Sequence, residues 1–86
     1  MKTFEFVIST PEGNLYHGEV VKVSLRGTEG DLAVMANHIP FITSVKPCDC
    51  SFVPAEGIEK SLNVGSGILS VTPKSVILMS GSAKWI

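Results

Sequence analysis

Apolar and polar residues alternate along most of this chain, which is the pattern of β-strands that bury one face. The alternation is clearest at 19–26, where Val21, Val23 and Leu25 share one face. It predicts strands at 4–8, 15–18 (a short strand or bend), 19–26, 32–36, 41–46, 49–53, 58–64, 68–71 and 76–79. No segment repeats apolar residues at the spacing of an amphipathic helix. The chain is therefore predicted to be all-β.

Some of these segments carry more detailed expectations. In 58–64, the pattern predicts that Ile58, Leu62 and Val64 face inward. The segment 49–53 gives no clear assignment of faces, and 76–79 is apolar on both faces. Turn residues recur at intervals of about 8–12 residues, which is typical of a sandwich or barrel. With 86 residues, the chain is long enough for one domain.

The stretch from 27 to 40 is the most specific part of the sequence. It opens with two glycines and two carboxylates, Glu29 and Asp31, between two β-like runs. Because glycine adopts positive φ without steric cost, this arrangement predicts a tight hairpin turn. The stretch closes on His38 and Pro40. Proline has no N–H to donate, so Pro40 suits the start of a strand or a sheet edge.

The composition is apolar for so short a chain. Hydrophobic residues make up 44% and charged residues 17%, against about 25% charged in an average soluble domain. No apolar run approaches the roughly 18 residues that cross a bilayer, so direct membrane insertion is not expected. The surplus predicts an apolar contact with a partner, and it leaves open whether the isolated domain self-associates. The net charge of −1 and the scattered lysines argue against binding nucleic acid.

Residues with catalytic or metal-binding chemistry are few. A metal site would draw on His17, His38, Cys48 and Cys50, whose spacing matches no zinc pattern. A disulfide between the two cysteines would strain an extended backbone, so we expect reduced thiols in a cytoplasmic protein. There is no nucleophile elbow and no phosphate-binding loop. The residues predict no enzyme and no cofactor; a free-standing β-sandwich that binds a small ligand or metal is the alternative.

Several motifs together resemble the epsilon subunit of rotary F-type ATP synthases. In the family's order and across nearly the whole chain, they are Thr10-Pro11-Glu12-Gly13, Tyr16-x-Gly18-Glu19-Val20, Gly27-Thr28-Glu29-Gly30-Asp31-Leu32, His38-x-Pro40-Phe41-Ile42-Thr43 and Gly65-Ser66-Gly67-Ile68-Leu69-x-Val71. Two positions depart from the family: Asn37 stands where glycine is frequent, and Cys48 where glycine is usual. Asparagine tolerates the left-handed conformation, so the first departure preserves the corner.

The resemblance covers only the family's N-terminal domain, and it implies a flattened two-sheet β-sandwich of about ten short strands over 1–86. The two-helix hairpin that usually follows in the family is expected to be absent from this chain. An inhibitory or ATP-sensing role is therefore not assigned to these residues.

The resemblance also implies a non-catalytic role in the central stalk, at the cytoplasmic face of a bacterial cell membrane. The domain would bind the gamma subunit and rest on polar loops of the membrane c-ring, so that ring rotation turns the stalk. The residues that would face the c-ring are Glu29, Gly30 and Asp31. Those that would face gamma are Thr10, His38 and Thr43. For Asp31 and His38, the alternatives are a solvated turn and a side chain that only stabilises its own corner. The sequence does not distinguish proton from sodium coupling.

Overall fold

The structure is a computed structural model that describes residues 2–27, 30–36 and 39–86, without the side chains of 26 and 27. These residues form nine strands and no helix. The strands are β1 (Phe4–Thr10), β2 (Gly13–Gly27), β3 (Gly30–Met35), β4 (Phe41–Val45), β5 (Cys48–Pro54), β6 (Lys60–Val64), β7 (Gly67–Val71), β8 (Ser75–Ser80) and β9 (Ala83–Trp85). The all-β prediction is confirmed, with nine strands in place of about ten.

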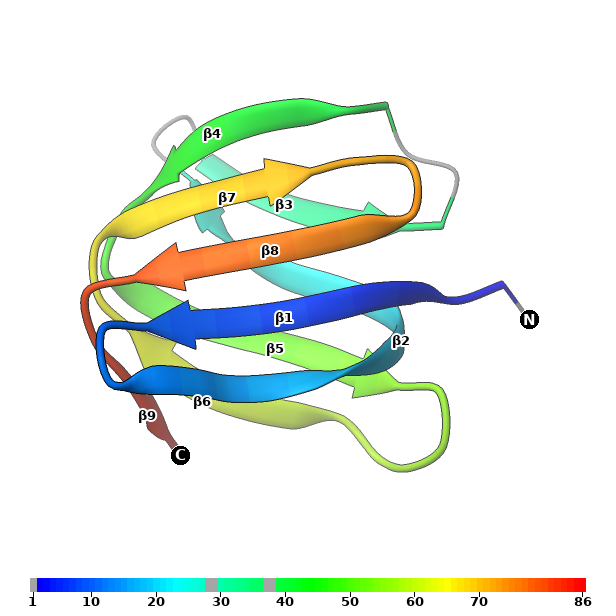
Figure 1. The fold of residues 1–86 in the computed structure, drawn as a ribbon, viewed down its shortest axis with the longest axis horizontal. Helices are drawn as coiled ribbons and strands as arrows, with labels where there is room; N and C mark the ends of the chain where they lie inside the picture. Colours follow the sequence, from blue (N-terminus) through cyan, green and yellow to red (C-terminus); the bar gives the residue numbers. More distant parts are fainter. Residues whose placement is uncertain (1, 28–29, 37–38) are drawn as a thin grey trace.

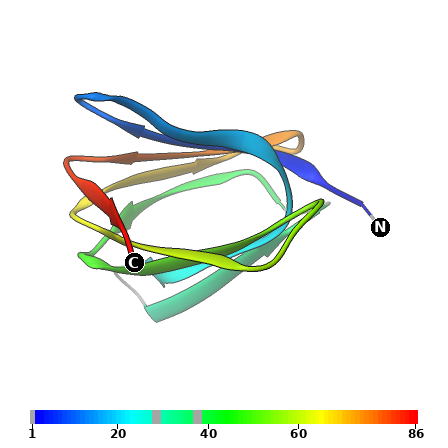
Figure 2. The same cartoon turned by 90° about the horizontal axis from the view of Figure 1, so that it is seen from below.

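The strands lie in two layers, which Figure 2 shows from the side. One layer, in front in Figure 1, contains β4, β7, β8, β1 and the first half of β2. The other contains β3, the second half of β2, β5, β6 and β9. We call them the front layer and the back layer. Neighbouring strands are antiparallel except β1 and β8, which are parallel.

The two layers share one strand, β2. Its first half pairs with β1, from Thr10 opposite Gly13 to Phe4 opposite Val20. Its second half pairs with β3 on one side and β5 on the other. The register against β5 shifts between Val20 and Lys22, and such a bulge bends a strand and increases its twist. The sequence pattern divided this strand at Gly18, but the bend lies beyond that residue, so one continuous strand passes through both layers.

The core lies between the two layers, and contacts between aromatic rings connect the layers. Phe6 of β1 and Phe52 of β5 are fully or almost fully buried, and their ring centroids lie 5.3 Å apart. Tyr16 of β2 lies 4.5 Å from Phe52, and Trp85 of β9 lies 6.1 Å from it on the same measure. Burying one large apolar side chain contributes about 1.5–3 kcal/mol. Phe52 therefore links the back layer to the front layer through Phe6 and Tyr16, and it also lies next to Trp85 of its own layer.

The structure corrects two expectations and resolves two others. Ile58 is 83% exposed rather than inward, because the connection after β5 extends to Glu59 and β6 begins only at Lys60. The strand β9 was not predicted, since three residues are too few to show an alternation; it is held by pairing with β6. In β5 the inward residues are Cys50 and Phe52. In β8 the apolar residues do divide between a buried and an exposed face.

Gly67, at the start of β7, lies so close to the backbone of the neighbouring β8 that there is no room for a side chain. A Cβ atom there would collide with the carbonyl oxygen of Met79 and lie 2.9 Å from the Cα atom of Ser80. Because both are backbone atoms, Gly67→Ala should lower the free energy of unfolding by about 1–3 kcal/mol, as overpacking does. Urea unfolding followed by circular dichroism measures the change.

Gly81→Ala is the matched control, because the nearest atom to a Cβ there is 3.9 Å away. This variant should unfold at nearly the wild-type urea concentration. Equal destabilisation by the two substitutions would contradict the close approach of Gly67 to the backbone of β8.

Candidate functional site

The predicted acidic hairpin joins β2 to β3. Gly27 pairs with Gly30, and the φ angle of Gly30 is +122°, which side-chain-bearing residues rarely adopt. Asp31 follows at once and is exposed. The flanks of the hairpin are therefore confirmed. Glu29 lies outside the described residues, so its position stays a prediction.

A cleft of about 700 Å³ opens in the back layer beside this hairpin. It lies between β3 and β5, with β2 beneath, and its polar and thiol-bearing lining residues are Ser24, Asp31, Cys48, Asp49 and Ser51. Asn63 of the neighbouring β6 donates a hydrogen bond from Nδ2 to Oδ1 of Asp49, at 3.1 Å. Arg26 pairs with Asp31 in the β2–β3 ladder, but its side chain lies outside the described part of the chain, so the charge next to this wall of the cleft is not assigned.

The two cysteines carry thiols and form no disulfide, as predicted. Cys48 is half-buried in the wall of the cleft, whereas Cys50 is fully buried in the core. Burial, with a smaller contribution from Cys48, raises the pKa of the Cys50 thiol from 9.0 to about 12. Outside the gaps at 28–29 and 37–38, no three His, Cys, Asp or Glu side chains are grouped so that they could hold a metal ion.

The outer side of the front layer carries an apolar surface. It is made by Ile42 of β4, Ile68 of β7, and Ile77 and Met79 of β8, which we call the apolar face. These side chains are 74%, 47%, 37% and 46% exposed, respectively. The strand register explains their grouping, because Ile68 lies opposite Met79 and Ile77 lies opposite Val7 of β1. Serines lie opposite these apolar residues in the ladders, Ser70 opposite Ile42 and Ile77, and Ser44 opposite Ile68, so no charged side chain stands between them.

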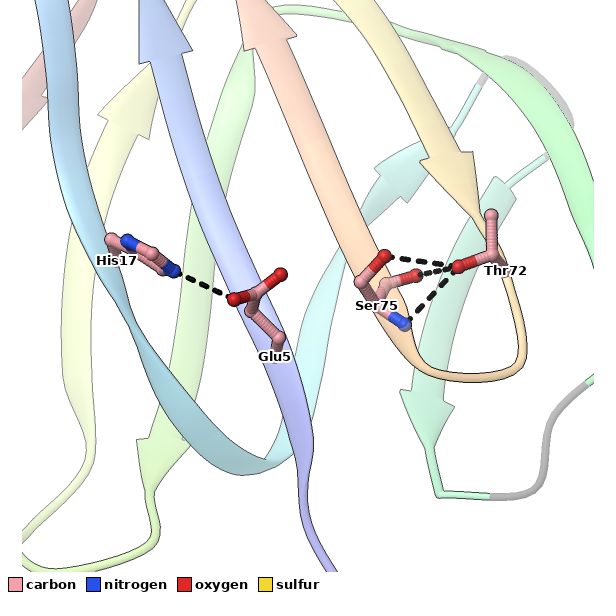
Figure 3. A network of polar contacts seen from close by, with 4 residues as sticks. All are labelled: Glu5, His17, Thr72 and Ser75. Atoms are coloured by element: carbon pink, nitrogen blue, oxygen red, sulfur yellow. Dashed lines mark hydrogen bonds and ion pairs between the residues drawn. The ribbon is translucent and has the colours of Figure 1, made fainter.

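Two neighbouring sets of polar contacts lie in the front layer, and Figure 3 shows them side by side. In the first, Nε2 of His17 lies 2.7 Å from Oε2 of Glu5, between the neighbouring strands β1 and β2. In the second, the hydroxyl of Thr72 accepts from the backbone N–H of Ser75 at 3.1 Å and donates to its carbonyl at 3.0 Å; Ser75 lies opposite Glu5 in the pairing of β1 and β8. The first pair is exposed to solvent and contributes little to stability. The second fixes the turn between β7 and β8.

The three residues expected to face gamma do not form one cluster. Thr10 ends β1, and its hydroxyl donates to the carbonyl of Gly13 at 2.9 Å within the β1–β2 turn. Thr43 lies in β4 opposite the buried Leu69, so its side chain points away from the apolar face. His38 lies outside the described residues. Between β1 and β4 stand β8 and β7, so Thr10 and Thr43 lie on opposite sides of the front layer.

The residues of the apolar face were not singled out from the sequence. One signal was present, because the segment 76–79 has no polar alternate and so cannot bury both of its faces in a thin sandwich. The other members, Ile42 and Ile68, give no such signal, because each has a small or polar neighbour: Thr43 follows Ile42, and Gly67 precedes Ile68. Their exposure depends on which side of the front layer the core occupies. That choice follows from the pairing of β2, which periodicity does not reveal.

The fold and these surfaces define a class of protein: a small β-sandwich domain with an exposed apolar face and a separate acidic hairpin. The chain belongs to the family described as "ATP synthase, Delta/Epsilon chain, beta-sandwich domain", whose sequence model matches residues 3–86. The expected family is thus confirmed. No helix long and apolar enough to span a membrane occurs in the ranges that the structure describes.

Relatives and solved structures agree with this assignment. The chain is 37% identical over 84 residues to the ATP synthase epsilon chain of Clostridium novyi, covering 98% of this chain and 64% of that one. It is 32% identical over 80 residues to the epsilon chain of Clostridium botulinum, covering 93% and 60%. The chain therefore spans less than two thirds of the length of these curated relatives.

Two solved assemblies contain a chain with the same fold. One is the Euglena gracilis mitochondrial ATP synthase (OSCP/F1/c-ring), with a TM-score of 0.88, 16% identity, and coverage of 94% of this chain and 52% of the other. The second is the central stalk and c-ring of the Tetrahymena thermophila mitochondrial ATP synthase, with a TM-score of 0.79, 10% identity, and coverage of 95% and 66%. At these identities the likeness establishes the fold.

The buried thiol of Cys50 makes stability depend on pH in the alkaline range. Its pKa is about 12 in the folded protein and near 9.0 when the group is exposed. The unfolded chain therefore loses this proton first, so the thiol's contribution is complete below about pH 9 and is lost as pH rises towards 12. Cys50→Ala should remove a slope of about 1 kcal/mol per pH unit from the free energy of unfolding.

Urea unfolding at several alkaline pH values measures this slope, and comparison with the wild type isolates the contribution of Cys50. The matched control is Cys48→Ala, which leaves Cys50 buried and should keep most of the slope, because burial is the larger cause of the raised pKa and Cys48 the smaller one. An unchanged slope in Cys50→Ala would contradict the assignment of the raised pKa to this thiol.

Proposed function

We propose that this chain is the coupling domain of a central-stalk epsilon subunit in a rotary ATP synthase. It binds the gamma subunit, rests on the c-ring, and links ion-driven rotation to ATP synthesis without catalysing a reaction itself. The domain lies peripherally at the cytoplasmic face of the bacterial cell membrane, held there by its partners. Membership of the epsilon family supports the proposal. The alternative, a module that binds a metal or small ligand, has no metal-binding cluster to support it among the described residues.

The observation that carries the proposal is the apolar face, because it is an exposed surface poor in charge, with Ile68, Ile77 and Met79 exposed on β7 and β8. Thr10 and Thr43 lie on the two sides of these strands. The side chain of Thr43 points away from the face, so a gamma subunit on the face would meet it from beside β4. Interface centres are typically apolar and poor in charge, with a polar rim. The apolar face and the polar pairs near it have this composition.

The c-ring contact is proposed for the other surface, the acidic hairpin with Glu29, Gly30 and Asp31. The hairpin and the apolar face lie on different parts of the molecule, so both partners can be bound at once (Figure 1). A small acidic turn meets a polar loop by electrostatic complementarity, which gives orientation and specificity more than affinity. His38, Thr10 and Thr43 are retained as the gamma-facing positions of this proposal.

A charge placed in the apolar face should weaken gamma binding. Ile68 occupies a central strand of the front layer and is 47% exposed, so Ile68→Lys leaves the core intact. Burying an ammonium group against an apolar partner carries a desolvation penalty. We expect at least about a tenfold rise in the dissociation constant for gamma, or about 1.4 kcal/mol. Isothermal titration calorimetry with purified gamma measures it.

Ile58→Lys is the matched control, because Ile58 is 83% exposed in the connection between β5 and β6, away from the front face. It should bind gamma as tightly as the wild type. If the two lysine variants bind equally well while both remain folded by circular dichroism, gamma does not use the apolar face.

Reversing the charge of the acidic hairpin should uncouple the c-ring and spare gamma. Asp31→Lys places a cation where the partner loop is proposed to meet an anion, and like charges in an interface are repulsive. In the assembled enzyme, ATP-driven ion pumping should fall while binding to purified gamma stays unchanged. Glu56→Lys makes the same change in the β5–β6 connection, at the other end of the molecule (Figure 1), and should leave both unchanged. Equal loss of pumping and gamma binding in Asp31→Lys would refute the division between the two surfaces.

A further inference from the structure

The structure points to a second part of the c-ring contact. We infer that the cleft between β3 and β5 receives a hydrogen-bond-donating side chain, basic or amide, from the partner loop that meets the acidic hairpin. The inference rests on the proposed function and deepens it, because it adds Asp49 and the serine hydroxyls of the cleft to a contact so far assigned to the hairpin alone.

The position of the cleft makes it continuous with the hairpin. Asp31 belongs to both, since it follows the turn directly and lines the cleft. The opposite wall comes from the start of β5, at Cys48 and Asp49. A loop that rests on the turn therefore lies next to an opening of about 700 Å³, within the size range of ordinary ligand pockets.

The carboxylate of Asp49 favours a donor over an acceptor in the cleft. Asp49 is exposed, and one of its oxygens accepts the hydrogen bond from Asn63 at 3.1 Å, which orients the carboxylate. A carboxylate has about four lone-pair sites, so a second donor can bind. The half-buried hydroxyls of Ser24 and Ser51 can accept from the same group, although a hydroxyl can also donate. Charge-assisted bonds from a guanidinium or ammonium group to a carboxylate are the strong ones, so a basic side chain fits best.

The cleft and the apolar face lie on different layers. The residues of the cleft belong to β2, β3 and β5 of the back layer, and those of the apolar face belong to β4, β7 and β8 of the front layer. Gamma bound to the front layer would leave the cleft open. The two contacts can therefore be separated by experiment.

Cys48 provides a native reporter of the cleft. Its half-buried thiol lines the opening, whereas Cys50 is fully buried and stays protonated near neutral pH. A small alkylating reagent such as iodoacetamide should therefore modify Cys48 and spare Cys50. The rate of modification, read by mass spectrometry of the labelled peptide, measures how open the cleft is without any assay of activity.

The experiment compares three states: the 86-residue chain alone, its complex with gamma, and the assembled enzyme with the c-ring. We expect equal labelling rates in the first two states and at least a tenfold slower rate in the third. Slowing by gamma alone would overturn the inference, because the cleft would then belong to the gamma interface. Undiminished labelling in the assembled enzyme would also overturn it, because the cleft would then be empty.

Failure of the proposed function itself gives a different result. If the chain binds neither gamma nor the assembled enzyme in a pull-down made before labelling, the proposed function is wrong and the inference falls with it. If the chain assembles but Cys48 stays reactive, only the inference is wrong. The two failures are therefore distinguished by the same set of samples.

A charge-removing variant tests the role of Asp49. Asp49→Asn keeps an oxygen that can accept from Asn63 but loses the negative charge. The protection of Cys48 in the assembled enzyme should fall at least threefold, with gamma binding unchanged. Glu59→Gln, at an exposed position before β6, removes the same charge outside the cleft and should keep full protection. Equal protection in the two variants would show that Asp49 does not bind the partner.

Discussion

The fold depends on one strand that belongs to both layers. Residues 13–20 of β2 complete the front layer against β1, and residues 22–27 stand between β3 and β5 in the back layer. The register shift at Val20–Lys22 lets the strand bend without interrupting the chain. Once β2 has this path, the inner faces of both layers are set, and Phe6 meets Phe52 between them. The core and the outer surfaces are therefore two results of the same constraint.

This path also separates two kinds of surface. Inward residues of the front layer pack against the core, so their neighbours Ile42, Ile68 and Ile77 face outward. The hairpin and the cleft are built on the other half of β2, in the back layer. Under the proposed function, an apolar partner and a polar partner would meet the same small domain at different places, as suits a connecting element.

Much of the fold could be predicted from the sequence, because alternation fixes strands locally. The acidic hairpin, the inward positions of Val23 and Leu25 and the thiol state of the cysteines followed from such local rules. Val21 was predicted to share their face, but it is half-buried and Val20 is the fully buried residue, because the register shifts between Val20 and Lys22. Tertiary pairing could not be predicted in the same way. Ile58 fits the alternation but precedes its strand, and β9 is held by its pairing with β6, with Trp85 near Phe52. For the site, the motifs indicated Asp31 and Thr43, whereas the apolar face and the cleft depend on strands that are distant in sequence.

The shared strand has a mechanical consequence for a rotor component. β2 runs without a break from the acidic hairpin at Gly27 to the front layer, so a pull on the hairpin acts along the strand. Hydrogen bonds of a ladder loaded along its strands resist together, whereas bonds loaded at one end open one after another. The pairing of β2 with β5 would therefore resist such a pull stiffly, whereas β2 and β3, the two arms of the hairpin, would move together. The register shift at Val20–Lys22, where the ladder is locally interrupted, would be the compliant joint between the two partners.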